Sequence, residues 1–437
     1  MSHNISAEVG AAPTTTRGER RRIVVSSLLG NTIEWYDFYI YGISAALFFP
    51  AIYFPSDSAL IGTLASFGTL AGGFLIRPVG GLIGGHIGDR YGRKKVLVGS
   101  MLLMGGSTVV VGILPGFETL GVWAPVLLII ARLLQGVGAG AEYGGSVLMI
   151  TEHFDSRRRG FWASLGNTGV FAGGVFATLT FAVITRFSED QQDYLWRVPF
   201  IASAVLVAVG LWIRLGVSET PAFKASLAKR TESVAPFVDL IRRYRATLVV
   251  VVVVATAASL PYQIYVTFGT AYTRTVEGNV GHLLNSQTII GFLALAMTPL
   301  FGYVSDRVGR KPLMVAGILV MIPAVYFLFS QINGQNQGMI LFALVICEIG
   351  HCMAYGPLAA FLAEHFDTRT RYTGTSMGYQ ICGAISGLAP LGATAILKAS
   401  GGAPNVGWVP IILVVTGVLG VVALFFAKEL AGKPLPD

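Results

Sequence analysis

The sequence contains few charged residues. Asp, Glu, Lys and Arg make up 12% of the 437 residues, whereas a typical soluble chain is about 25% charged. A chain with so few charges cannot cover a water-facing surface with polar side chains. The composition therefore argues against a soluble enzyme, a soluble nucleic-acid-binding protein and a disordered chain.

Cysteine is also scarce, and a targeting signal is missing. The three cysteines, Cys347, Cys352 and Cys382, lie in apolar stretches, and no two of them form a C-x-x-C pair. We therefore predict small buried side chains rather than a metal or redox site. The first 22 residues are polar and carry no apolar segment, so we expect no cleaved secretory signal.

Apolar residues and glycine are abundant instead. The chain is 53% hydrophobic and has 54 glycines, and glycine is frequent in membrane helices because it lets their backbones approach closely. Unbroken apolar runs such as 249–254 favour helices over the alternating strands of a membrane barrel. Segments of roughly 20 apolar residues can span a bilayer, and we predict twelve, numbered as spans 1 to 12 in chain order: 23–52, 59–86, 96–115, 121–150, 160–186, 195–215, 246–272, 283–304, 313–332, 338–363, 373–398 and 406–427.

The basic residues indicate the orientation. Most of the 31 Lys and Arg residues lie in the tails and loops on the side shared by both termini, and basic loops stay in the cytoplasm. We therefore predict two cytoplasmic termini. Topology accounts for the net charge of +8 without a nucleic-acid partner. The predicted units are a tail (1–22), a six-helix bundle (23–215), a polar cytoplasmic linker (216–245), a second six-helix bundle (246–428) and a tail (429–437).

The two halves resemble each other in sequence. Residues 85–94 after span 2 match residues 302–311 after span 8, and residues 152–159 after span 4 match residues 364–371 after span 10. The number of residues that separates a segment from its match is nearly the same for both pairs of segments. This indicates that the chain is a duplicated six-helix unit. Parallel repeats of this kind are a transporter plan in which the substrate binds between the halves near the bilayer midplane.

Several motifs resemble a known family. The loop motif Gly85-x-x-x-Asp89-Arg90-x-Gly92-Arg93-Lys94 and the span 4 motif Arg132-Leu-Leu-Gln135-Gly136-Val-Gly138 resemble signatures of the major facilitator superfamily. Three further segments resemble the metabolite–proton symporter branch of this superfamily: 34–39 (Glu-Trp-Tyr-Asp-Phe-Tyr), Arg77-Pro78-Val-Gly80 and 142–145 (Glu-Tyr-Gly-Gly). The likeness covers nearly the whole chain and is greatest for the shikimate and organic-acid members. Members more often carry Gly-Gly-Glu-Trp where this chain has Ala141-Glu142-Tyr143, and no long C-terminal coiled coil follows span 12, which argues against the osmosensing proline or betaine type.

The resemblance implies a fold and an activity. The expected fold is an all-α membrane protein with twelve transmembrane helices in two pseudo-symmetric bundles. The expected activity is proton-coupled import of a small organic acid such as shikimate across the plasma (inner) membrane. We expect no cofactor besides the proton gradient, no metal, no catalytic residue, lipid as the surroundings, and a functional monomer. A symporter of a zwitterionic or neutral metabolite is the alternative. An intramembrane enzyme is not favoured, because the sequence has no H-E-x-x-H or G-x-S-x-G motif.

Span 1 carries two carboxylates inside the membrane. An ionisable group there costs about 2.5–3.5 kcal/mol on insertion scales and is a functional candidate by default. Glu34 and Asp37 lie three residues apart, and Asn31 and Tyr41 extend the same polar flank. We interpret Glu34 and Asp37 as proton carriers and Asn31 and Tyr41 as substrate-binding candidates. The alternative is that each group makes one hydrogen bond that fixes the helix.

Span 4 carries the basic partner. Arg132, Gln135 and Glu142 lie on one helical stripe, and a buried arginine is always charged and needs an anion. That anion is either the carboxylate pair of span 1 or the substrate. Together, these two options suggest how proton uptake is coupled to substrate binding. A proton neutralises Asp37 or Glu34 and frees Arg132 for the incoming substrate carboxylate. The alternative is a permanent salt bridge. Gln135 and Glu142 are further binding candidates.

Polar residues in other spans complete the candidate cavity. Glu348, His351 and Tyr355 share one stripe of span 10, and His351 is a second candidate proton site because histidine titrates near neutral pH. The remaining substrate-binding candidates are Asn167 in span 5, Tyr262 and Gln263 in span 7, and Tyr379 and Gln380 in span 11.

The loop motifs predict a cytoplasmic gate. A carboxylate such as Asp89 can accept hydrogen bonds from the N-terminus of a neighbouring helix and pair with arginine. The family resemblance implies a latch made by Gly85, Asp89, Arg90, Gly92 and Arg93, with Asp306 and Arg310 as its counterpart in the second half. The alternative is that these charges only set the topology.

Overall fold

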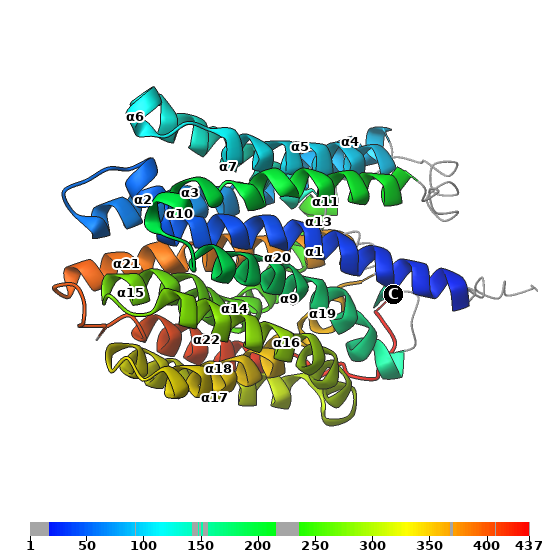
Figure 1. The fold of residues 1–437 in the computed structure, drawn as a ribbon. Coiled ribbons are helices and arrows are strands. Elements are labelled where there is room, and N and C mark those ends of the chain that lie inside the picture. The colour runs from blue at the N-terminus through cyan, green and yellow to red at the C-terminus, as the bar shows by residue number, and fades with distance from the viewer. Residues whose placement is uncertain are drawn as a thin grey trace, which may run out of the picture.

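A computed structural model describes residues 17–91, 93–141, 147, 150–151, 156–215, 236–367, 370–406 and 408–436. Every regular element in these residues is a helix, and none is a strand. Each of the twelve predicted spans contains a helix, so the predicted all-α fold is confirmed. The start of α1 and the C-terminus lie at the same end of the helices (Figure 1), as the basic loops predicted.

The N-terminal half contains spans 1 to 6. In order they are α1 (Arg17–Leu47) with α2 (Phe49–Ile52), α3 (Ala59–Leu75) with α4 (Arg77–Tyr91), α5 (Arg93–Ile113), α7 (Trp123–Gly140), α9 (Arg159–Ile184) and α11 (Val198–Leu215). In the described residues, three short helices lie between them: α6 (Phe117–Leu120), η1 (Ser156–Arg158) and α10 (Glu189–Leu195).

The C-terminal half contains spans 7 to 12. In order they are α14 (Arg245–Tyr262) with the π-helix η2 (Gln263–Phe268) and α15 (Gly269–Thr275), α16 (Val280–Val308), α17 (Arg310–Asn333), α18 (Gln337–Tyr355) with α19 (Leu358–Glu364), α20 (Arg371–Gly387) with α21 (Ala389–Ala399), and α22 (Ile411–Phe426). The predicted linker 216–245 contains a helix that the sequence analysis did not predict, α13 (Pro236–Arg243); the linker residues before it lie outside the described part.

Hydropathy agrees with these assignments for most spans. In the described residues, nine helical stretches are long and apolar enough to cross a membrane, and the shorter apolar helices Val98–Ile113 and Ile411–Phe426 coincide with spans 3 and 12. Span 1 does not reach the same hydropathy, because α1 carries Asn31, Glu34 and Asp37 in its interior. The least apolar span is therefore the one with the two predicted proton carriers.

Four spans change direction or helix type near their middle. Proline lies at each change: Pro78 in the first turn of α4, Pro261 before the π-helix, Pro357 between α18 and α19, and Pro390 in the first turn of α21. Proline removes a backbone donor and crowds the preceding turn, and broken helices and π-turns commonly occur at functional sites. Each break lies within a few residues of a side chain that lines a cavity between the halves: Arg77, Gln263, Tyr355 and Ser386.

The halves pack along several helix pairs. The helix α9 lies against α16, and α20 lies against both α3 and α4. In Figure 1, α5 and α7 lie at one edge of the molecule and α17 and α18 at the other, with α1, α9 and α16 between them. The interface between the halves therefore crosses the centre of the molecule.

Candidate functional site

A small cavity lies between the two halves. It encloses ≈ 40 Å³, which is well below the roughly 300–1,000 Å³ of ligand pockets, so a metabolite can enter only if the halves move apart. The N-terminal half contributes Trp35 and Tyr39 (α1), Phe74 (α3), Arg77 (α4) and Val170 (α9); the C-terminal half contributes Ser259, Tyr262, Gln263, His351, Tyr355, Tyr379, Cys382, Gly383 and Ser386.

Arg77 is the one cation among the residues that line this cavity. Its Nη2 lies 3.2 Å from Glu34 Oε1, and both side chains are buried. Its guanidinium also lies 3.7 Å from the centre of the Phe38 ring, a cation–π distance. Nε of Arg77 makes no hydrogen bond to any described residue, and Nη2 makes only the ion-pair contact with Glu34. This arginine therefore has donor capacity left over at the cavity wall.

The second carboxylate of α1 belongs to a different cluster. Asp37 Oδ2 accepts a hydrogen bond from Thr108 Oγ1 (2.8 Å), and Thr108 Oγ1 accepts one from Gln135 Nε2 (2.8 Å). Gln135 Oε1 in turn accepts a hydrogen bond from Arg132 Nη1. Asp37 and Arg132 are thus connected through two neutral side chains, and none of these residues lines the cavity.

Aromatic rings surround Arg132. Its guanidinium lies 4.1 Å from the ring centre of Tyr41 and 4.3 Å from that of Phe38. A side-chain carbon at Gly73 would collide with the Arg132 side chain, so glycine at this position makes room for the guanidinium. Arg132 is fully buried within the N-terminal half rather than exposed to the cavity.

Aromatic and polar side chains form the wall from the C-terminal half. The His351 ring stacks on Tyr355 at 5.1 Å between ring centres and lies 5.0 Å from Tyr262. His351 Nδ1 donates to the backbone carbonyl of Ala258 (3.0 Å), and the hydroxyls of Tyr355 and Tyr379 lie 2.9 Å apart. This wall offers hydroxyl and amide groups to a ligand but no permanent charge.

Glu348 lies behind this wall. Its Oε2 accepts a hydrogen bond from Tyr265 Oη (2.7 Å), and its Oε1 accepts one from Cys352 Sγ (3.4 Å). Glu348 is fully buried and does not line the cavity. The role predicted for Glu348 in substrate binding therefore remains a prediction.

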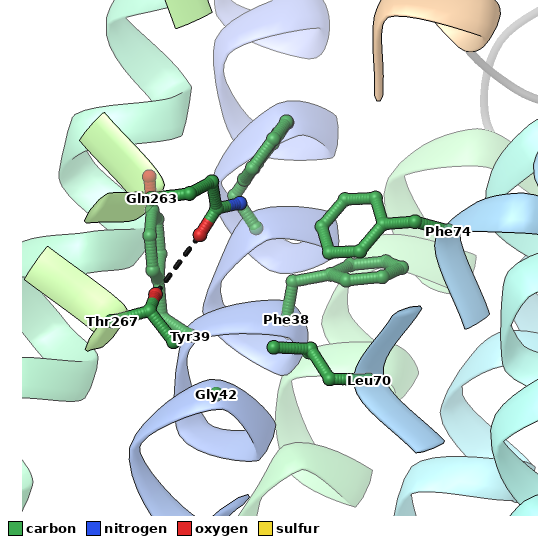
Figure 2. A pocket seen from close by; sticks show the side chains of 8 residues that line it. Phe38, Tyr39, Gly42, Leu70, Phe74, Gln263 and Thr267 are labelled. Atoms are coloured by element: carbon green, nitrogen blue, oxygen red, sulfur yellow. Dashed lines mark hydrogen bonds between the residues drawn. The ribbon is translucent and has the colours of Figure 1, made fainter. Parts of the chain in front are cut away.

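A second, smaller cavity lies next to the first. Figure 2 shows Phe38, Tyr39 and Gly42 of α1 facing Leu70 and Phe74 on one side and Gln263 and Thr267 on the other. It encloses ≈ 10 Å³, and Thr267 Oγ1 donates to Gln263 Oε1 (2.9 Å). Further toward the outer end of α1, Arg274 Nη1 donates to the backbone carbonyl of Leu47. The contact of Arg274 with Leu47 joins the halves between the central cavity and the outer surface.

A charged network joins the halves on the cytoplasmic side. Glu364 Oε1 lies 3.2 Å from Arg159 Nη1 of the other half and 3.1 Å from Arg310 Nη2. Asp306 pairs with Arg310 at 2.8 Å. Its two carboxylate oxygens also accept hydrogen bonds from the backbone N–H of Gly160 (2.8 Å) and Phe161 (3.0 Å), at the start of α9, where helical N–H groups lack internal partners.

The structure separates the predicted site residues into groups. Among them, Tyr262, Gln263, His351, Tyr355 and Tyr379 line the central cavity. The others with described side chains make helix contacts: Asn31 Nδ2 donates to Gly166 O (2.9 Å), Tyr41 Oη lies 2.6 Å from Thr69 Oγ1, Gln380 Nε2 donates to Gly140 O (3.3 Å), and Asn167 is buried in α9. The remaining predicted site residues lie outside the part of the chain whose side chains are described: Glu142, Gly85, Asp89, Arg90, Gly92 and Arg93.

Sequence reasoning missed three charged residues at these sites. The sequence analysis uses Arg77 only as part of a family motif; in the structure a helix begins at Arg77, with Pro78 in its first turn. The signal was that span 2 continues for another turn or more beyond Arg77. Arg159 and Glu364 were read as loop charges and are both buried between the halves.

Comparison with known proteins identifies the family. The family model described as "Major Facilitator Superfamily" matches residues 27–389 and 286–436. The chain belongs to the major facilitator superfamily. Members of this superfamily are transporters, and this chain is accordingly a multi-pass membrane transporter rather than an enzyme.

Its relatives within the superfamily differ in substrate. In Escherichia coli, the inner membrane metabolite transport protein YhjE is 36% identical (84% of this chain and 85% of that protein covered), the shikimate transporter 33% (86% and 87%), and the proline/betaine transporter 29% (96% and 85%). The solved structure of a D-xylose–proton symporter has a TM-score of 0.73 at 20% identity, with 95% of this chain and 99% of that chain covered. This structural likeness shows the fold alone.

Proposed function

We propose that the protein imports a small organic acid together with protons by alternating access between its two halves. The observation that carries this proposal is Arg77, a buried arginine on the wall of the cavity between the halves. An arginine fork matches a carboxylate better than any other side chain does. The similarity to the shikimate transporter supports the same substrate class.

Charge balance supports proton coupling. The described membrane interior of the N-terminal half contains two buried acids, Glu34 and Asp37, and two buried bases, Arg77 and Arg132. Buried charges are costly unless they are paired, and these four balance when both acids are ionised. A bound monoanion upsets the balance, and one proton on the two carboxylates restores it. We therefore propose that the loaded protein carries one proton for each monoanion.

Contacts on both sides of the cavity support alternating access. Opening toward the cytoplasm requires that Arg159 separates from Glu364 and that the N-terminus of α9 separates from Asp306; opening outward requires that Arg274 leaves the end of α1. We propose the predicted loop residues 85–93 as the symmetric part of the cytoplasmic gate. We also propose that the units 23–215 and 246–428 move as bundles joined by 216–245 within one monomer.

Uptake by reconstituted protein tests this function. Liposomes containing the full chain should accumulate labelled shikimate when the outside is more acidic than the lumen and should stop when a protonophore collapses the gradient. Unlabelled hydroxylated monocarboxylates should compete. Uptake that is equally fast without a pH gradient would contradict the proposal.

A zwitterionic substrate is the second candidate. The pair of Arg77 and Glu34 offers one charge of each sign at the cavity edge, which would suit the carboxylate and the ammonium group of an amino acid or betaine. The similarity to the proline/betaine transporter supports this candidate. Competition by proline or glycine betaine but not by shikimate would favour it over an organic acid.

A further inference from the structure

We infer that the Arg77–Glu34 ion pair is the anion site itself: Arg77 binds the carboxylate of a hydroxylated monocarboxylate, and Glu34 releases Arg77 when it takes up one proton. This inference rests on the proposed function and deepens it, because it assigns the substrate-binding charge to Arg77 rather than to Arg132. It also makes one residue pair responsible for specificity and for taking up the proton, while the charge of Asp37 keeps the anion from crossing without that proton.

The geometry distinguishes the two buried arginines. Nε and Nη2 make no hydrogen bond to a described residue in either arginine, but Arg77 lines the cavity and Arg132 does not. Arg132 lies behind Phe38 and Tyr41 and donates to Gln135. A carboxylate that enters the cavity therefore meets Arg77 and is separated from Arg132 by aromatic rings.

The same geometry makes Glu34 the competitor for Arg77. Glu34 Oε1 lies 3.2 Å from Arg77 Nη2, so it neutralises the guanidinium when the substrate is absent. Two carboxylates around one arginine leave a surplus negative charge in a buried site, which is costly. Protonation of Glu34 removes that charge. The proton comes from the external solution while the cavity is open outward and stays on Glu34 while the anion is bound.

The cavity wall indicates the rest of the substrate. The C-terminal half presents the hydroxyl and amide groups of Ser259, Tyr262, Gln263, Tyr355, Tyr379 and Ser386. Such groups pair well with substrate hydroxyls. Because Arg77 is the one permanently charged cation among the lining residues, the site balances one carboxylate and disfavours dicarboxylates.

Other ionisable groups face this pair and belong in any test of its pH dependence. They come from the helices packed around it: Asp37 on α1, Arg132 on α7, His351 and Tyr355 on α18, and Tyr379 on α20. Asp37 and Arg132 also form a buried acid–base pair of the same net charge. They therefore supply a matched comparison that the cavity does not touch.

Equilibrium binding to the purified, detergent-solubilised full chain tests the inference. Shikimate, as a hydroxylated monocarboxylate, should bind about tenfold more weakly for each pH unit of increase above neutrality, because binding takes up one proton. Glu34→Gln should bind it with no such pH dependence. Arg77→Gln should lose about 10- to 100-fold in affinity at every pH, as expected for a lost charge-assisted contact. Arg77→Lys should recover part of this loss, because it keeps the charge but not the fork.

A matched pair of double variants separates this site from the other cluster. Glu34→Gln with Arg77→Gln should lose shikimate binding and keep binding of its uncharged methyl ester. Asp37→Asn with Arg132→Gln, which makes the same charge change, should retain a pH-dependent affinity for the anion. Arg197→Gln removes an arginine that donates to Gly112 O and Leu114 O outside the cavity, and should bind shikimate as the wild type does. Monodisperse elution shows that each variant is folded.

Several outcomes would overturn the inference while leaving the proposed function intact. One such outcome is that the pH gradient drives uptake by the wild type while Arg77→Gln binds shikimate with normal affinity. Another is an unchanged pH dependence in Glu34→Gln. Tighter binding of α-ketoglutarate than of shikimate would reject the monocarboxylate assignment, and so would a failure of every hydroxylated monocarboxylate to bind. Loss of proton-driven uptake in the wild type would instead reject the proposed function.

Discussion

Glu34 and Asp37 lie three residues apart on α1, and each belongs to a different polar cluster. Glu34 faces Arg77 at the edge of the central cavity, with 3.2 Å between the charged atoms. Asp37 is linked through Thr108 and Gln135 to Arg132 inside the N-terminal half. One helical turn thus separates the carboxylate that pairs with the cavity-lining Arg77 from the carboxylate inside the N-terminal half. The arrangement allows the two carboxylates to be tested separately.

The variant Asp37→Asn should uncouple transport from the proton gradient. The substitution leaves one surplus positive charge in the buried cluster, so a monoanion can bind and cross without a proton. We expect no accumulation of labelled shikimate above its equilibrium level under an imposed pH gradient. Exchange of internal for external shikimate should stay within about tenfold of the wild-type rate, which is the effect of about 1.4 kcal/mol.

Thr108→Val provides the comparison for this variant. It removes the hydrogen bond to Asp37 and keeps the charge, so it should lower the rate and retain accumulation. Full concentrative uptake by Asp37→Asn would remove Asp37 from the proposed coupling mechanism.

A methyl group at Gly73 should disturb the Arg132 cluster. The added carbon would collide with the Arg132 side chain, and overpacking of this kind costs about 1–3 kcal/mol. Gly73→Ala should therefore lower the melting temperature in detergent and weaken proton-driven uptake. The neighbouring Gly72→Ala is the control, because its new carbon would meet only Leu133 Cδ2, at 3.8 Å. Equal effects of the two substitutions would show that the room for Arg132 is not what matters.

Breaking the cytoplasmic network should expose the central cavity. Glu364 holds Arg159 and Arg310 together, and removing one partner of a buried ion pair costs about 3–5 kcal/mol. In Glu364→Gln, alkylation of Cys382, which lines the cavity, should be about tenfold faster or more, since 1.4 kcal/mol corresponds to a factor of ten. Mass spectrometry of the alkylated peptide measures this rate.

The control for this experiment is Glu118→Gln on α6, because Glu118 is exposed and lies outside the network. Its rate of Cys382 alkylation should match that of the wild type. If Glu364→Gln also reacts at the wild-type rate, the network does not hold the cytoplasmic side closed.

Acid should weaken the attachment of the C-terminal tail through Glu429. Its burial on its own would raise the pKa, but hydrogen bonds from the backbone N–H of Lys311 and Ala431 hold the pKa of Glu429 below its ordinary value. A lowered carboxylate pKa stabilises the folded state above the unfolded pKa of about 4.3, and this stability is lost as the pH falls through the folded pKa.

The measurement is a melting curve of the wild type and of Glu429→Gln across pH. We expect the variant to melt about 1–3 °C lower at pH 7 and the difference to disappear once the pH falls below the lowered pKa of Glu429, which lies under the ordinary value of about 4.3. A difference that is the same at both pH values would mean that ionised Glu429 does not hold the tail.

Span positions and orientation could be predicted from the sequence because the membrane imposes a strong, local constraint. A bilayer requires long apolar helices, and the basic loops fix their direction. The same logic found Glu34, Asp37 and Arg132, because any charge inside an apolar segment stands out. The helix breaks at Arg77 and at Gln263 were not predicted, since a proline shows where a helix is weak but not whether it restarts.

Partner choice could not be predicted, because it depends on how helices pack. Nothing in the spacing of Glu34 and Asp37 shows that one faces Arg77 and the other is linked to Arg132. The side chains that line the cavity come from α1, α3, α4 and α9 on one side and from helices of the C-terminal half on the other. Such a set is defined by contacts between segments far apart in the chain.

The dependence of uptake on membrane potential tests the central claim, one proton for each monoanion, most directly. The loaded protein then moves no net charge, so a potential that acts with about 2.3 kcal/mol per charge at 100 mV has no effect on that step. Liposomes whose potential is set by valinomycin and potassium at equal pH on both sides should take up labelled shikimate at a rate that hardly changes with potential. An imposed pH gradient without a potential should drive accumulation. Strong stimulation by an interior-negative potential at fixed pH would contradict the claim.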